Sequence, residues 1–320
     1  MAISDLRGGE LVSGEFIVRE KSLQDFRSKP GRYLTLLLAD ETGQIEGRAW
    51  ENAETLAKEC AVGEVVYLQG QAEEYKGRVQ LKIVKLEARP GAAVSKYLPT
   101  LEEARIRELA GKFKELVGTV QDRHLRALLD KLFGDAATWE KFCAATAARS
   151  LHSAYVGGLL EHTMNVATLC EAVCSLYPEI NRDLLISAAL LHDIGKMDAI
   201  ELRGVVFEYT EPGKLIGEPV LGERRLSAVI GELPGFPPRH HLMLSHLLLS
   251  HHGEYEFGAP VLPSCLEAFV LHHVDNLEAK TNGVLNIMKR ATDPEKVWSE
   301  FSRSLERSIY LPRLEPEEEA

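Results

Sequence analysis

Residues Leu184 to Lys196 read Leu-Leu-Ile-Ser-Ala-Ala-Leu-Leu-His-Asp-Ile-Gly-Lys, an apolar run that ends in the adjacent pair His192 and Asp193. A continuous apolar run of this length predicts a helix that is buried on most sides. Burying an imidazole and a carboxylate at the end of this helix would cost free energy unless another group pairs with them. A divalent metal ion is one such partner. Gly195 is the residue type at which such a helix stops. For this dipeptide alone, a hydrogen-bonded cap on an ordinary core helix is the alternative.

Further metal-ligand side chains lie on other apolar helical patterns. His162 is upstream of the pair, on one such pattern. The dipeptide His251-His252 closes a later apolar run, and Asp275 lies on the next. Histidines and carboxylates in this order converge only through folding. The sequence therefore predicts a metal centre inside a helical domain.

These residues resemble the HD superfamily of metal-dependent phosphohydrolases, whose signature is carried here by His162, His192-Asp193 and Asp275. The segments Leu-Leu-Glu-His-Thr, His-Asp-Ile-Gly-Lys, Leu-Ser-His-His-Gly and His-His-Val-Asp-Asn-Leu-Glu-Ala-Lys, behind a small β-rich segment, look like those of YhaM-type 3′-to-5′ exoribonucleases. The resemblance covers nearly the whole chain. It implies a metal-dependent phosphodiesterase, with Mn²⁺ as its cofactor, that shortens single-stranded RNA from the 3′ end and releases nucleoside 5′-monophosphates.

The resemblance also implies roles for single residues. Four would hold the first metal ion: His162, His192, Asp193 and Asp275. The Asp193 carboxylate would bridge to a second ion held by His251 and His252, unless one of these histidines only donates its ring N–H to a carboxylate. Lys196 would bind a phosphate oxygen, and a solvent-exposed charge at a helix end is the alternative. Ligand type alone does not choose among Mn²⁺, Fe²⁺, Mg²⁺ and Zn²⁺.

One residue departs from the YhaM-type pattern. That pattern has a Gly-His-Ile step after an excursion that we expect to be a small hairpin within Arg203 to Leu215. This chain instead reads Gly217-Glu218-Pro219, so Glu218 stands where a histidine ligand is expected. Because a carboxylate can still coordinate a metal, the second site is retained, weakened or retuned.

The front of the chain, from about residue 11 to residue 88, has the pattern of short strands. The expected strands are Gly14 to Arg19, Tyr33 to Ala39, Gln44 to Trp50, Val65 to Gln71 and Arg78 to Glu87. The segment Glu51 to Cys60 predicts a short helix between the third and fourth strands. Strands in this arrangement suit an OB-fold barrel, whose open face often binds single-stranded nucleic acid.

Such a face needs aromatic rings for base stacking and basic groups for phosphates. We expect five residues to contact nucleic acid: Tyr33, Arg48, Trp50, Tyr75 and Arg78. For each of them, the alternative is a ring in the barrel core or a charge on a solvated face.

The break at Arg89-Pro90-Gly91 divides the chain into an all-β OB-fold domain and an all-α HD domain. The expected parts are residues 1–90 for the OB-fold, 91–150 for a helical linking region, 151–310 for the HD domain and 311–320 for an acidic tail. Helices are expected at Thr100 to Val117, His124 to Leu132, Thr138 to Ala148, Tyr155 to Leu176, Asp183 to Lys196, Gly222 to Glu232, His241 to His251, Pro263 to Glu278 and Pro294 to Leu305.

The composition is that of an ordinary globular protein. The net charge of −11 argues against broad attraction to nucleic acid, although a local groove or a metal centre could still attract phosphate. The five cysteines form no Cys-x-x-Cys pair, which favours reduced thiols in the cytoplasm. We expect no secretory signal and no membrane span, because no apolar run reaches about 18 residues.

Other functions stay open on the sequence alone. An HD-domain nucleotide phosphohydrolase is one, although Gly253 is not followed by the Gly-Tyr-Pro hallmark of cyclic-dinucleotide enzymes. A catalytically weakened nucleic-acid-binding module is another, motivated by Glu218. Single-stranded DNA is an alternative substrate. Relatives suggest an assembly of several subunits, but no stretch of this chain identifies a homo-oligomer interface.

Overall fold

A computed structural model of the chain describes residues 2–26, 30–40, 42–75, 78–92, 97–98, 100–148, 155–203, 206–291 and 296–311. Contacts divide the chain into one unit of Met1–Pro99 with Leu202–Glu208, and a second of Thr100–Glu201 with Tyr209–Ala320. Among the described residues, no helix combines the length and the hydropathy that crossing a bilayer requires. Residues 312–320 of the expected acidic tail lie outside the described residues.

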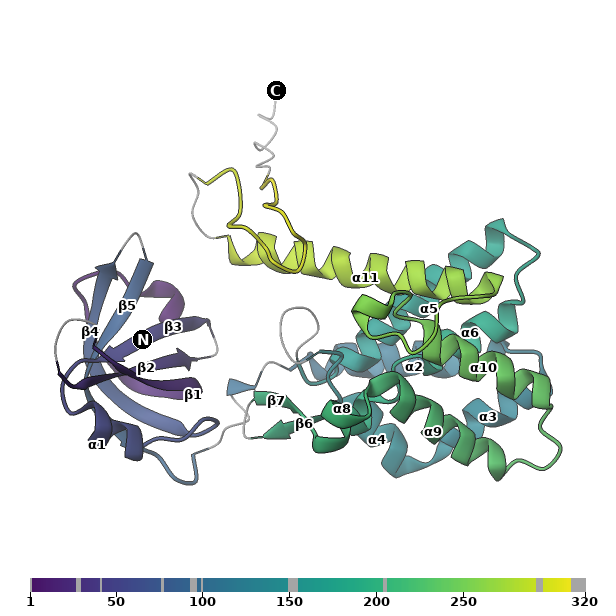
Figure 1. Cartoon of the computed structure of the whole chain (residues 1–320), viewed down its shortest axis with the longest axis horizontal. Helices are drawn as coiled ribbons and strands as arrows, with labels where there is room; N and C mark the ends of the chain where they lie inside the picture. Colours follow the sequence, from purple (N-terminus) through teal and green to yellow (C-terminus); the bar gives the residue numbers. More distant parts are fainter. Residues whose placement is uncertain are drawn as a thin grey trace. The chain divides into compact units, whose positions relative to one another are not determined.

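The first unit contains a closed barrel with the strand order β1-β2-β3-β5-β4 (Figure 1). Its elements are β1 (Leu11–Asp25), β2 (Arg32–Ala39), β3 (Gln44–Ala49), α1 (Ala53–Lys58), β4 (Val65–Tyr75) and β5 (Arg78–Ala88), after a short 3-10 turn, η1 (Ile3–Asp5). The strands β3 and β5 pair in parallel, and the other pairs are antiparallel. The predicted OB-fold, with its helix between the third and fourth strands, is confirmed.

Alternation along the strands builds the barrel core. In β2, Leu34, Leu36 and Leu38 are fully buried, whereas the residues between them are partly exposed. This is the period of two that places one face of a strand inward. The first strand runs six residues beyond the predicted end at Arg19, because its exposed end still pairs with β2 as far as Asp25. Exposed polar residues carry no alternation, so the sequence pattern could not reveal this extension.

The second unit is helical. It consists of α2 (Glu103–Thr119), α3 (Arg123–Gly134), α4 (Ala136–Ala144), α5 (Gly158–Leu176), α6 (Arg182–Leu191), α7 (Lys196–Ala199), α8 (Glu211–Leu215), α9 (Glu218–Gly231), α10 (Pro238–Ser250), η3 (Tyr255–Phe257) and α11 (Leu266–Arg290). A two-stranded hairpin, β6 (Ile200–Arg203) with β7 (Val206–Tyr209), interrupts the series between α7 and α8. The predicted hairpin excursion is therefore present.

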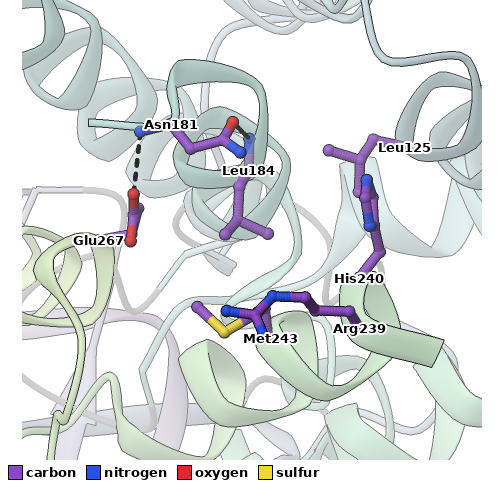
Figure 2. Close-up of a pocket in the computed structure, with 7 residues that line it drawn as sticks. All are labelled: Leu125, Asn181, Leu184, Arg239, His240, Met243 and Glu267. Carbon is purple, nitrogen blue, oxygen red and sulfur yellow. Dashed lines mark hydrogen bonds between the residues drawn. The ribbon is translucent and has the colours of Figure 1, made fainter. Parts of the chain in front are cut away.

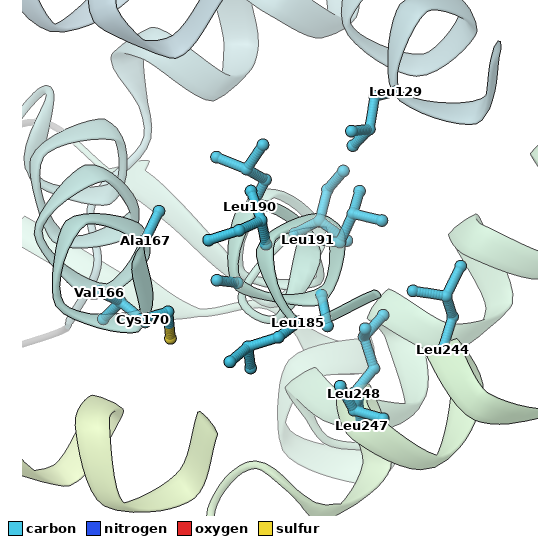
Figure 3. Packing of buried hydrophobic residues seen from close by; sticks show 14 of the residues in the cluster. Leu129, Val166, Ala167, Cys170, Leu185, Leu190, Leu191, Leu244, Leu247 and Leu248 are labelled. Atoms are coloured by element: carbon cyan, nitrogen blue, oxygen red, sulfur yellow. The ribbon is translucent and has the colours of Figure 1, made fainter. Parts of the chain in front are cut away.

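The helix α6 is the centre of the helical core. Every residue from Leu184 to Leu191 is buried, as the apolar run predicted. Figure 3 shows residues of α5, α6 and α10 converging, with Cys170, Leu185 and Leu248 among them. Because α2, α3 and α4 contribute to the same core cluster, residues 100–148 of the segment expected to link the domains pack as part of this unit.

One expected helix is absent, and the limits of others differ from the prediction: α6 ends at Leu191 rather than Lys196, and α9 begins at Glu218 rather than Gly222. The last expected helix is absent where the structure describes residues 296–305, since Trp298 forms a β-bridge with Tyr310 and Ser302 with Arg307. Its apolar residues have helical spacing, but the segment forms bridges with residues further along the chain instead. The helix α11 continues to Arg290 rather than ending near Glu278. Beyond Glu278, none of the described side chains of α11 is buried.

Gly70 lets β4 and β5 approach closely, because a Cβ built there would lie 2.3 Å from the Lys82 carbonyl oxygen. Gly70→Ala should destabilise the barrel by about 2 kcal/mol or more, since backbone must move to relieve the overlap. Faster hydrogen–deuterium exchange in β4 and β5 peptides would report the effect. The matched control is Gly14→Ala, whose Cβ would meet Phe16 at an ordinary 3.5 Å. Equal exchange in both variants would contradict the prediction.

Candidate metal centre

Among the described residues of the helical unit, two groups of metal-ligand atoms occur, each with its atoms within 4.8 Å of one another. The first group is His162, His192 and Asp275, and the second is Asp193, Glu218, His251 and His252. All seven residues were singled out from the sequence. The helices α5, α6, α9, α10 and α11, with the turn after α6, bring them together.

The carboxylate of Asp193 faces both groups. Its Oδ2 lies 3.2 Å from Nε2 of His162 and 3.4 Å from Nε2 of His192. Its Oδ1 lies 3.5 Å from Nε2 of His251, in the second group. Asp275 completes the first group, with Oδ1 3.1 Å from Nε2 of His162. One side chain thus offers a different oxygen to each group.

The second group contains polar atoms that the protein leaves unpaired. Among the described residues, Oδ1 of Asp193, both carboxylate oxygens of Glu218 and Nε2 of His251 are buried without a hydrogen-bond partner. Oε2 of Glu218 lies 3.8 Å from Nε2 of His251 and 3.7 Å from Nε2 of His252. Buried polar atoms without partners are rare because each is costly. Imidazole nitrogens and carboxylate oxygens converging in this way fit a divalent metal ion.

Backbone carbonyls orient two of the histidines. Nδ1 of His192 lies 2.8 Å from the Ala189 carbonyl oxygen, and Nδ1 of His251 lies 2.7 Å from that of Leu248. A carbonyl can only accept, so in each ring Nδ1–H donates and Nε2 is the nitrogen that remains for a metal ion. Nε2 of His192 lies 3.2 Å from Nε2 of His162 in the first group, and Nε2 of His251 lies in the second group, as metal ligands require.

The orientation of a third histidine, His162, depends on a residue that was not predicted from the sequence. Nδ1 of His162 lies 2.6 Å from Oε2 of Glu278, and Asn165 and Asn282 donate to the other oxygen of that carboxylate. Glu278 comes three residues after Asp275 on α11, so a shared helix face was a signal available in the sequence. Burial would lower the pKa of His162, but the carboxylates around it outweigh burial and raise the pKa well above its usual value. The site therefore favours positive charge there.

Lys196 lies inside the site rather than in solvent, with 18% of its side chain exposed, and Nζ donates to Oδ2 of Asp193. Burial would lower the pKa of Lys196, but the Asp193 carboxylate outweighs burial and raises it. Burial would raise the pKa of Asp193, but the Lys196 ammonium and the His192 imidazole hold it well below its usual range. Both groups are therefore charged.

Glu218 owes its position to a close approach of α9 to the turn after α6. The helix begins at Glu218, directly after Gly217 with φ of +88°. A Cβ on Gly195 would lie 2.2 Å from the Glu218 carbonyl oxygen and 2.5 Å from the amide nitrogen of Gly222. Burial raises the pKa of Glu218 to about 8, and Asp193 adds to the shift. A cation in this group would lower that pKa again.

The metal-ligand residues border a pocket of about 300 Å³, whose lining includes His162, Lys196, His252 and Asp275. Figure 2 shows another pocket of the helical unit, of about 270 Å³, between α3, α6, α10 and the start of α11. Its lining contains none of the seven candidate ligands. The pocket with the metal-ligand groups is therefore the candidate active site.

On the barrel, three of the five expected nucleic-acid contacts lie together. The rings of Tyr33 and Trp50 stack at 5.1 Å between centroids, and Phe26 packs against both. The guanidinium of Arg48 lies 5.7 Å from the Trp50 ring, while also pairing with Glu46. The sequence analysis missed Phe26, which stands just beyond β1 without a strand pattern around it.

Tyr75 and Arg78 lie elsewhere along the barrel. They pair with each other at the β4–β5 turn, and 52% of Tyr75 is exposed. In the parallel pair of β3 and β5, Arg48 stands opposite Lys82. Arg78 is four residues before Lys82 in β5, or about 13 Å at the usual rise of a strand. The side chain of Arg78 is outside the described residues.

Comparison with known proteins matches both units. Residues 159–280 match the HD domain family, and residues 16–88 match the OB-fold nucleic acid binding domain family. The 3′-5′ exoribonuclease YhaM of Listeria monocytogenes serovar 1/2a is 33% identical over 97% of this chain and 98% of its own length. The YhaM of Listeria welshimeri is 34% identical over the same shares. That of Geobacillus sp. (strain WCH70) is 33% identical over 87% of this chain and 86% of its own.

Gly195→Ala should separate α9 from the turn that carries Asp193, because the new Cβ would overlap backbone atoms. We expect the helical unit to lose about 3 kcal/mol of stability and to gain less stability from added divalent metal ions. Thermal unfolding with and without the metal measures both effects. Gly231→Ala, on the same helix α9 with open space around it, is the control and should be neutral or slightly stabilising. An unchanged metal response in Gly195→Ala would refute this account.

Proposed function

Because the chain belongs to the YhaM family of 3′-5′ exoribonucleases, we propose that it hydrolyses single-stranded RNA from the 3′ end and releases nucleoside 5′-monophosphates. The observation that carries the proposal is the buried Asp193 carboxylate, which faces both groups of metal-ligand atoms. This arrangement suits phosphodiester hydrolysis, in which the attacking and the leaving oxygen both need stabilisation. Single-stranded DNA is the substrate to compare.

The HD-type clusters indicate a divalent metal, and we propose Mn²⁺ as the ion. His162, His192, Asp193 and Asp275 would hold one ion. His251, His252 and Glu218 would hold a second ion, which shares Asp193 with the first. When bound, such ions make a water more acidic and offset the negative charge of the phosphate.

Two side chains of the protein, Lys196 and Glu278, have further roles at this site. Lys196 fixes Oδ2 of Asp193 by its hydrogen bond. Because its pKa is raised, its ammonium group keeps a positive charge in the pocket. We propose that this ammonium also binds a non-bridging phosphate oxygen of the RNA, where it would stabilise charge that grows in the transition state. Glu278 keeps the His162 ring turned with Nε2 towards the first group.

We propose that the barrel binds the RNA strand through stacking and phosphate contacts. The cluster of Phe26, Tyr33 and Trp50, with Arg48 beside it, has the ring and charge types that such binding needs. Tyr75 and Arg78 are proposed as contacts at a separate point of the same barrel.

We keep the domain limits 1–90, 91–150, 151–310 and 311–320 as a proposal, and we propose a cytoplasmic location from the five cysteines without a Cys-x-x-Cys pair. Assembly into a homo-oligomer also stays a proposal.

Asp193→Ala should abolish hydrolysis while sparing RNA binding, because the shared ligand lies in the helical unit and the aromatic cluster in the barrel. The assay follows a 5′-labelled RNA with added Mn²⁺, beside a chelator control. A ladder that shortens from the 3′ end with the unsubstituted protein alone is the expected result. Equal loss of RNA binding and hydrolysis in Asp193→Ala would contradict the assignment of hydrolysis to the helical unit and of RNA binding to the barrel.

Glu218→Ala should lower hydrolysis about 10- to 100-fold, a loss typical when a group that supports a metal site is removed. Glu218→His should keep most of the activity, because an imidazole also ligates divalent metals. Initial rates and the metal content of each purified variant measure the effect. Glu232→Ala, just after the end of α9, is the control and should act like the unsubstituted protein. Full activity in Glu218→Ala would exclude Glu218 as a ligand.

A further inference from the structure

The pocket at the metal centre combines two kinds of chemistry. Besides His162, His252 and Asp275 of the ligand groups, its lining includes Lys196 and Phe257. The imidazoles, the carboxylate and the ammonium suit a metal ion and a phosphate, but Phe257 suits neither. With a volume of about 300 Å³, the pocket is at the small end of the range for ligand sites, which suits a single nucleotide.

The backbone of Phe257 is fixed next to the metal-ligand residues. It ends the 3-10 turn η3, in which the Phe257 amide donates to the Glu254 carbonyl and the Gly258 amide to that of Tyr255. Gly258 adopts φ of +88°, and a Cβ built on it would lie 3.9 Å from Nδ1 of His252. The turn therefore lies against the second ligand group, and its position follows from hydrogen bonds that do not involve the Phe257 ring.

The ring of Phe257 is uncovered although it lines this pocket. The residue is 58% exposed, and it belongs to none of the ring pairs found among the described residues. An exposed apolar ring beside buried charges gains from a flat apolar partner, because water is then removed from both faces in contact. Every nucleobase offers such a face, and stacking is tolerant of base identity.

We propose that Phe257 is the surface on which the 3′-terminal base of the RNA stacks, so that it sets how tightly the terminal nucleotide binds. The inference rests on the proposed function and names a substrate contact for it. The phosphate would then meet Lys196 and the ligand groups while the base meets the ring. Because stacking ignores the base's hydrogen-bonding edge, all four terminal nucleotides would be accepted.

The test compares two 5′-labelled RNAs that differ only at the 3′-terminal nucleotide, which is ordinary adenosine in one and abasic in the other. Phe257→Ala should raise the KM for the ordinary RNA about tenfold and leave kcat within about twofold, since stacking supports substrate and transition state alike. It should leave removal of the abasic nucleotide unchanged. Phe257→Tyr should behave like the unsubstituted protein, because it keeps the ring.

Tyr255→Ala is the matched control, since Tyr255 is 67% exposed on the same turn but does not line the pocket. It should change neither substrate's kinetics. Equal losses on both RNAs in Phe257→Ala, or no loss on either, would overturn the stacking role while leaving the exoribonuclease proposal intact. An unsubstituted protein that hydrolyses neither RNA would instead overturn the proposed function, and the stacking role with it.

Discussion

The carboxylate of Asp193 is the constraint around which the helical unit is built. A buried carboxylate that must face two ligand groups with different oxygens needs a position fixed from several sides. The helix α6, buried from Leu184 to Leu191, fixes it from one side, and Lys196 holds one of its oxygens. Gly195 supplies the last condition, because any side chain there would keep α9 and Glu218 away. The same few residues therefore determine both how the helices pack and where the metal ligands lie.

Much of this could be predicted from the sequence because the signals are local. The apolar run of α6, the alternation in β2 and the histidine and aspartate motifs each carry a period or a residue type tied to one structure. The motifs predicted residues that the fold brings into two groups, including Glu218 in place of the expected histidine. The resemblance added the family, which the comparison confirmed.

The remainder could not be predicted because it depends on pairing across the chain. The end of β1 is held by β2, although its own residues are exposed and, apart from Leu23, polar. The bridges of Trp298 and Ser302 replace a helix that apolar spacing suggested. Phe26 gains its role only from the rings that lie beside it after folding. Spacing within one segment does not record such partners.

The two histidines oriented by carbonyls are each the first residue after a helix, His192 after α6 and His251 after α10. The negative ends of two helix dipoles therefore point at the ligand groups, which favours a cation before any ligand side chain is counted. The carbonyls of Ala189 and Leu248 also cannot be deleted by a side-chain mutation, unlike the Glu278 carboxylate that orients His162. A mutation can thus loosen His162 far more easily than His192 or His251.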